Sequence, residues 1–232
     1  MGLEFEHRSS DSPLIERVWR SWSLNTTTMT SVARAHCDFV FWEGRDGIHA
    51  GVQGPESRAS QAPVPADAEF IGVRLALGTL LPTWPASELV DRFVEFPVDG
   101  NWFHLAGDRV RRPRFDDAEE FVALLVRKGL LLTTVVQDIA LTDRTRQRRY
   151  LAAVGLPQRT VLQIERANDA AIRLRHGQPP AAVAQASGYF DQPHLARSLR
   201  RFIGPSATEL AIQSQSRNPL SLLYKTESRR DR

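Results

Sequence analysis

The 232-residue sequence contains one cysteine, Cys37, and no long apolar run. A single cysteine excludes an internal disulfide framework and any zinc or iron–sulfur site that needs several cysteines. No segment approaches the roughly 18 consecutive apolar residues of a membrane span. The first eight residues include two acids and lack the apolar core of a signal peptide. We therefore expect a cytoplasmic protein that holds no metal and contacts no membrane.

Lysine is also scarce, since Lys128 and Lys225 are the only two and arginine supplies the other basic residues. A GC-rich genome would favour arginine everywhere, but codon bias does not explain how the charges are distributed. Residues 1–132 hold 14 basic and 19 acidic side chains, whereas residues 133–232 hold 16 and 8. A basic half joined to an acidic half is typical of a nucleic-acid-binding module attached to a second domain.

The composition, with 42% hydrophobic and 25% charged residues, is that of an ordinary globular protein, and the length allows one domain or two. The first part of the chain is predicted to be rich in strands. Residues 40–42 and 47–52 flank a Gly-Arg-Asp-Gly turn and predict a hairpin. Residues 70–77 predict a further strand, residues 54–66 a loop, and residues 86–93 a short helix.

Tryptophan is concentrated before residue 103, and its role there stays open. These side chains either fill a β core or line in part a ligand pocket, because pockets for small molecules are mostly apolar and aromatic. The five residues are Trp19, Trp22, Trp42, Trp84 and Trp102.

Residues 109–115 are basic and interrupted by proline, and they predict a linker. Acidic residues open the next segment, 116–128, and basic residues close it before Gly129, which is the charge order that a helix dipole favours. Helical periodicity then continues to about residue 213. We expect an α+β protein with a β-rich sensor or dimerisation domain over 1–114, an all-α domain over 115–215 and a polar tail over 216–232.

The second half contains a weak internal repeat at an offset of 49 residues. Arg148 corresponds to Arg197, and Gly155 corresponds to Gly204. Each copy predicts a short helix (133–139 or 181–187), a tight turn (140–141 or 188–189) and an N-cap before a helix of about 12 residues. Two helices joined by such a turn form a helix-turn-helix, whose second helix enters the major groove of DNA.

The two longer helices carry basic faces without acids. Arg144, Gln147 and Arg148 share one outer face of the first, while Leu195, Leu199 and Phe202 form the core stripe of the second. Residues 144–155 include four arginines and no acid, and residues 192–204 include three and no acid. Arginine and glutamine can pair with base edges, and a like-charged face favours a polyanion. The alternative is a face that is merely solvated.

The segment between the copies, residues 158–176, predicts a helix with a continuous apolar stripe. At 1.5 Å per residue it spans roughly 28 Å. A helix of that length can set two recognition helices about one turn of DNA apart, or roughly 34 Å.

These motifs resemble the DNA-binding domain of the AraC/XylS family of bacterial transcriptional regulators. The resemblance covers residues 118–213 and rests on residues 188–204 for the second motif and on residues 141–150 with Gly155 for the first. It implies that both recognition helices bind one face of double-stranded DNA. The implied contacts are Arg144, Gln147 and Arg148 in the first motif and Gln192, Pro193, His194, Ala196 and Arg197 in the second, to which we add Arg200 as a phosphate contact.

Two residues depart from the family pattern, Arg146 in place of an apolar residue and Ala207 in place of a proline. By the repeat, Arg146 aligns with Leu195, so we expect it to face inward. It must then extend its charge to solvent or meet an acid such as Asp138 or Asp169. On this interpretation Arg146→Leu stabilises the domain.

Residues 72–78 and 84–89 resemble a small β-rich domain found in one branch of these regulators, which implies a sensor or dimerisation role. The resulting hypothesis is a sequence-specific, nucleoid-associated transcription factor modulated by a small-molecule effector. RNA polymerase and a second copy of the chain are further partners that it allows.

Two alternatives remain open. One is an enzyme, since a similar helix-turn-helix pair accompanies DNA-repair methyltransferases, which need a reactive cysteine. Cys37 lies between His36 and Asp38, but neighbours on a strand point to opposite faces, so a buried cysteine is the better interpretation. No paired-carboxylate, phosphate-loop or HExxH pattern appears, and we expect neither an enzyme nor a cofactor. The other is a DNA-binding accessory protein without sequence preference.

Overall fold

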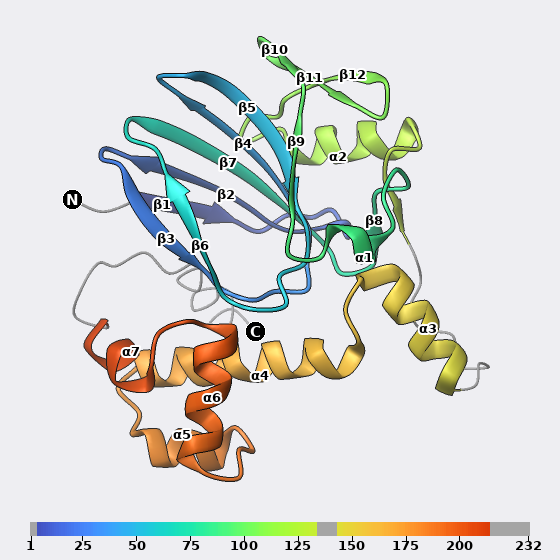
Figure 1. Ribbon diagram of the computed structural model, residues 1–232. Coiled ribbons are helices and arrows are strands. Elements are labelled where there is room, and N and C mark those ends of the chain that lie inside the picture. The colour runs from blue at the N-terminus through green and yellow to red at the C-terminus, as the bar shows by residue number, and fades with distance from the viewer. Residues whose placement is uncertain (1–3, 134–142, 214–232) are drawn as a thin grey trace.

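The computed structural model describes residues 4–133 and 143–213. Within these ranges a β-rich N-terminal region is followed by six helices, α2 to α7 (Figure 1). The main sheet has six antiparallel strands in the order β1-β2-β7-β4-β5-β9. Their bounds are Glu4–Arg8, Ile15–Ser23, Ala68–Leu75, Asp38–Gly44, Gly47–Gln53 and Phe93–Phe96.

The predicted hairpin is confirmed as β4 and β5, which pair from Asp38 with Gln53 to Gly44 with Gly47. Gly47 has a φ of +123°, a conformation that other residues rarely adopt. The predicted strand at 70–77 is also confirmed, as β7.

Short strands complete the N-terminal region and correct two expectations. Strand β3 (Thr27–Ser31) pairs with β6 (Ser60–Val64), so part of the expected loop at 54–66 is a strand. Strands β10 (Val98–Asp99), β11 (Trp102–Leu105) and β12 (Asp108–Arg111) form a small sheet, so the expected linker at 109–115 begins as a strand. There Val110 is buried between two exposed arginines, the alternation of a half-buried strand. Strands β8 (Thr79–Leu80) and β13 (Leu132–Thr133) also pair.

Helix α2 (Ala118–Arg127) covers one face of the main sheet. The Phe121 ring packs edge-on against Phe39 at 5.4 Å and Phe41 at 5.7 Å between centroids. Val122 and Leu125 belong to the same buried cluster as these sheet residues. The expected boundary between residues 114 and 115 stays a prediction, and α2 shares its core with the sheet.

The remaining helices form a second buried cluster. They are α3 (Asp143–Val154), α4 (Gln158–Arg175), α5 (Pro180–Ala186), α6 (Gln192–Phe202) and α7 (Ala207–Gln213). The apolar stripe of α4 packs against Leu195, Leu199 and Phe202 of α6, as the periodicity predicted. The predicted helix at 133–139 begins at Thr133, which is in β13, and otherwise lies outside the described residues, as does the tail at 216–232.

The second cluster also includes residues of the N-terminal region, Val32, Ala33 and Ala35. The helices are therefore docked on the β-rich region through shared apolar burial. Helix α1 (Ala86–Leu89) contributes to this docking beside α3, and it is shorter than the expected helix at 86–93. It ends early because Val90 is extended and Asp91 has a φ of +56°.

Candidate nucleic-acid interface

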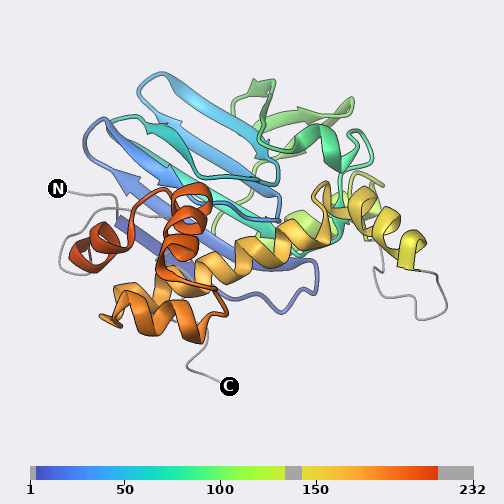
Figure 2. The same ribbon diagram turned by 60° about the horizontal axis from the view of Figure 1, so that its bottom comes forward.

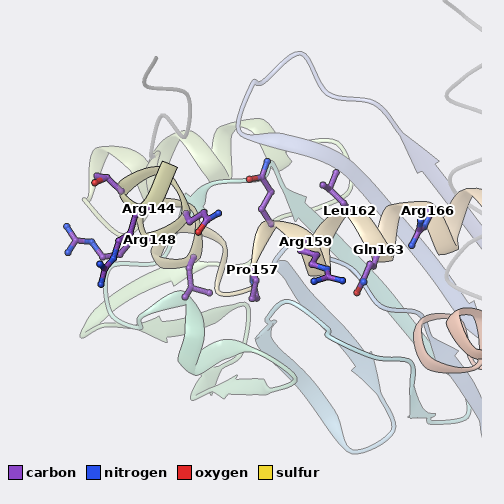
Figure 3. Close-up of a pocket in the computed structure, with 11 residues that line it drawn as sticks. Arg144, Arg148, Pro157, Arg159, Leu162, Gln163 and Arg166 are labelled. Carbon is purple, nitrogen blue, oxygen red and sulfur yellow. The ribbon is translucent and has the colours of Figure 1, made fainter. Parts of the chain in front are cut away.

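An open groove of about 1120 Å³ lies between α3 and α4. Figure 3 shows arginines from both helices along this groove, and Pro157 marks the corner where α3 gives way to α4. All three residues predicted for the first motif line it. The complete lining is Arg144, Thr145, Gln147, Arg148, Leu151, Pro157, Gln158, Arg159, Leu162, Gln163 and Arg166.

Two arginines of this groove were missed by the sequence analysis, Arg159 and Arg166 on α4. With Gln163 they stand at i, i+4 and i+7, the same kind of spacing that places Arg144, Gln147 and Arg148 together. The signal was present in the sequence, but the interpretation of this segment used only its apolar stripe and its length. The groove thus contains four guanidinium groups and no carboxylate among its lining residues. Such a concave, single-signed surface concentrates anions.

Arg166 also connects the groove to the second motif. Its guanidinium lies over the Tyr189 ring, 4.6 Å from the centroid, and donates a weak hydrogen bond to the Gly188 carbonyl at 3.4 Å. Gly188 has a φ of +68°, which allows the tight turn between α5 and α6. Tyr189 is buried in that turn, and its hydroxyl lies 3.0 Å from Ser198 Oγ on α6. The turn is therefore fixed against both α4 and α6.

Helix α6 presents a polar face opposite its buried stripe. Asp191 caps the helix, because its side chain accepts a hydrogen bond from the His194 backbone N–H at 2.7 Å. The His194 ring is half-buried and packs edge-on against Tyr189 at 5.2 Å, so it helps to hold the turn. The other residues predicted for the second motif are exposed: Gln192, Pro193, Ala196, Arg197 and Arg200.

Helix α4 separates the two basic surfaces. Figure 2 shows α3 beside one end of α4 and α5 with α6 beside the other. The expected spacer at 158–176 is confirmed as an 18-residue helix, about 27 Å long at 1.5 Å per residue. It begins after Pro157, and Gly177, with a φ of +79°, follows its C-terminal end.

The expected inward position of Arg146 is wrong, because its side chain is exposed. Buried residues of α3 occur near its C-terminal end, at Ala153 and Val154, where the helix meets the second cluster. Tyr150 is only half-buried there. An exposed arginine keeps its charge in water, so replacing it removes no unfavourable desolvation free energy. The stabilisation expected for Arg146→Leu therefore no longer follows.

Replacing Asp191 with alanine should lower the free energy of unfolding of the full chain by about 1 kcal/mol, the usual contribution of an N-cap side chain. Asp191→Asn is the matched control, because asparagine also accepts the hydrogen bond from His194 N–H. Urea unfolding of the three proteins measures the difference. An asparagine variant as unstable as the alanine variant would contradict a capping role.

Cys37 lies directly before β4 and is not part of a strand, unlike the expected buried strand cysteine. It is partly buried, and burial, together with the Asp38 charge, raises the pKa of its thiol to about 12. Within residues 4–133 and 143–213, no three His, Cys, Asp or Glu side chains gather as a metal site would require. In the same ranges no helix has the length and apolarity to cross a membrane.

No protein-family model, curated protein or solved structure matches this chain.

Proposed function

We propose that this protein is a sequence-specific DNA-binding transcriptional regulator of the AraC/XylS type. Helices α3 and α6 are its recognition helices, and they enter successive major-groove segments on one face of the duplex. The observation that carries this proposal is the placement of two acid-free faces, each with arginine and glutamine, at the two ends of the single helix α4.

Charge supports the proposal because neither the lining of the groove nor helix α6 itself contains a carboxylate, although Glu209 of α7 lies close enough to Arg200 to interact with its charge. Arg144, Arg148 and Arg159 are exposed in the groove, and Arg197 and Arg200 are exposed on α6. Neutralising phosphates with such side chains releases counterions, which supplies much of the affinity of a protein for DNA. Gln147 and Gln192 add the amide groups that can pair with adenine edges.

The packing of the turn supports the same interpretation. Helices α5 and α6 are joined by a short turn that Gly188 and Tyr189 hold in place. A recognition helix must be rigid to read base edges, and Asp191, Tyr189 and Arg166 fix the N-terminal end of α6. The methyltransferase alternative is less well supported, because a thiol with a pKa near 12 is a poor nucleophile at neutral pH.

Selection of binding sites from random DNA at near-physiological salt tests the proposal. The full chain should enrich one motif with two blocks about one helical turn apart. If the chain binds DNA but no sequence motif is enriched, the protein is a DNA-binding accessory protein without sequence preference. Absence of DNA binding would refute the proposed function.

Gln192→Ala should change the selected motif at one or two base pairs, because a bidentate base contact contributes roughly 1–3 kcal/mol of discrimination. Arg200→Ala is the matched comparison on the same helix, and we expect it to weaken all sequences about equally. For Arg200→Ala, the slope of log affinity against log salt concentration should become shallower by about one unit, the effect of one lost phosphate contact. If Gln192→Ala selects the unchanged motif, Gln192 does not read a base.

A further inference from the structure

A second cavity, of about 710 Å³, is lined by residues of the main sheet and of the two-stranded ribbon formed by β3 and β6. Figure 1 shows where these strands lie in the β-rich region. This volume falls within the roughly 300–1,000 Å³ of typical small-molecule pockets. The cavity uses the sheet face opposite α2, because Val40 and Trp42 line it while Phe39 and Phe41 pack on α2. It therefore lies outside the hydrophobic core and away from the basic groove.

Aromatic rings line most of this sheet face, and two of them cover glycines of the strands beneath. Gly72 and Gly51 pair with Val40 from the two sides of β4. A Cβ on Gly72 would lie 1.9 Å from the Trp19 ring, and a Cβ on Gly51 would lie 2.3 Å from the Phe93 ring, so each ring lies directly over a glycine. The aromatic lining residues are Phe5, Trp19, Trp42, Phe70 and Phe93. A slot of this kind favours a flat ring that stacks on the aromatic walls.

The polar and charged groups of the cavity are mostly occupied within the protein. The Trp19 Nε1–H is buried without an acceptor among the residues that the structure describes, but the indole edge that carries it lies against Gly72 and does not face the cavity. The charged groups at the other end are already paired: Arg34 bonds to Glu56 at 2.6 Å and to Asp38 at 2.8 Å, and Arg74 bonds to Asp38 at 2.9 Å. Arg58 also lines the cavity and is exposed, so a basic side chain stands beside these paired groups.

The wall of the cavity continues directly into the end of α6. Ser31 and Arg34 line the cavity, and between them the Ala33 N–H donates a hydrogen bond to the Phe202 carbonyl at 2.8 Å. The Ala33 carbonyl accepts a hydrogen bond from Asn168 Nδ2 of α4 at 3.3 Å. On the other side of the ribbon, Ala59 N–H donates to the Arg201 carbonyl at 2.8 Å. A molecule that moves the ribbon must therefore move α6 or break these bonds.

We propose that this cavity binds a flat aromatic molecule, and that the β3–β6 ribbon transmits its binding to α6. The ring packs among the aromatic side chains that line the cavity, including the edge of Trp42. The transmission to DNA binding rests on the function proposed above, whereas the binding of the molecule does not.

Calorimetric titration of the full chain with coumarin tests the ligand class without DNA. Coumarin is a flat bicyclic lactone with a carbonyl acceptor, and octahydrocoumarin has the same carbonyl on a puckered ring. We expect saturable coumarin binding at least tenfold tighter than binding of octahydrocoumarin. Trp42→Leu should weaken it at least tenfold, whereas Trp102→Leu, at an exposed tryptophan outside the cavity, should leave it unchanged. Absence of saturable coumarin binding, or equal effects of the two variants, would overturn the assignment.

Hydrogen exchange of the Ala33 and Ala59 amides tests the coupling, again without DNA. Bound coumarin should change the exchange rate of both amides at least threefold, because each amide stands in the chain between residues that line the cavity. On a selected DNA site, coumarin should then change affinity about fivefold or more, the lower range of allosteric coupling. Unchanged amides with normal coumarin binding would refute the coupling. Altered amides without any DNA binding would refute only the proposed function.

Discussion

Replacing Arg144 and Arg148 together with alanine should remove about 2–4 kcal/mol of DNA-binding free energy, a roughly 30- to 1000-fold loss of affinity. Both side chains are exposed in the groove between α3 and α4, and the lining of that groove contains no carboxylate. Their removal leaves Arg159 and Arg166 as its basic groups, so weak binding through α6 should persist. Fluorescence anisotropy with the selected DNA, repeated at several salt concentrations, measures both the affinity and its salt dependence.

A matched control removes two arginines from the β-rich region. Arg45→Ala with Arg111→Ala changes the net charge equally, and both side chains are exposed and absent from the lining of the groove. If the effect of the groove pair were only a loss of net charge, the two double variants would bind DNA equally well. That result would contradict the assignment of the groove as the first DNA contact surface. Equal thermal stability of both variants confirms that the comparison concerns binding.

The helical half was the more predictable part of this chain, because the apolar stripe of a helix depends on residues close together in sequence. The expected helix at 181–187 occurs at Pro180–Ala186, and the spacer expected at 158–176 occurs at Gln158–Arg175. The core stripe of Leu195, Leu199 and Phe202 was also correct. Arg146 was misplaced because the repeat was assumed to give α3 the same packing along its whole length as α6.

Strand β2 could not be recognised from its sequence because it lacks the regular solvent-exposed face that a half-buried strand has. Val18 lies in the core, while Trp19 on the other face lines the cavity. Arg17 and Ser21 are buried as well, so apolar and polar residues do not alternate along the strand. The cavity on the second face of β2 is therefore also the reason why alternating hydrophobicity does not reveal this strand in the sequence.

The docking of the helices on the β-rich region was likewise outside the reach of local patterns. Asn168 and Ala33, which form a hydrogen bond, are 135 residues apart in sequence. Nothing in the periodicity of α4 marks Asn168 as the residue that meets a distant backbone carbonyl. The sequence did predict which faces of the helices are apolar. The structure adds that one of these faces covers part of the β-rich region.

Asp38→Asn should lower the free energy of unfolding by about 3 kcal/mol, because it leaves buried guanidinium groups without their shared carboxylate. Asp38 is only 1% exposed and bonds to both Arg34 and Arg74, and Arg74 is itself buried. Asp67→Asn is the matched control. Asp67 pairs with Arg45, whose side chain is 81% exposed, and such surface pairs contribute less than about 1 kcal/mol.

The pH dependence of this difference identifies its cause. Burial alone would raise the pKa of Asp38, but the charges of Arg74 and Arg34 outweigh burial and hold the pKa below its ordinary value of 3.8. A lowered pKa in the folded state stabilises the fold above the unfolded pKa, and this contribution is lost as pH falls through the folded value. The difference in unfolding free energy between the original protein and Asp38→Asn should thus be constant above about pH 5 and should become smaller below about pH 4. Urea unfolding from pH 7 to pH 3 measures it. A gap that does not change with pH would show that the substituted amide disturbs packing, and that the carboxylate charge does not hold the two arginines.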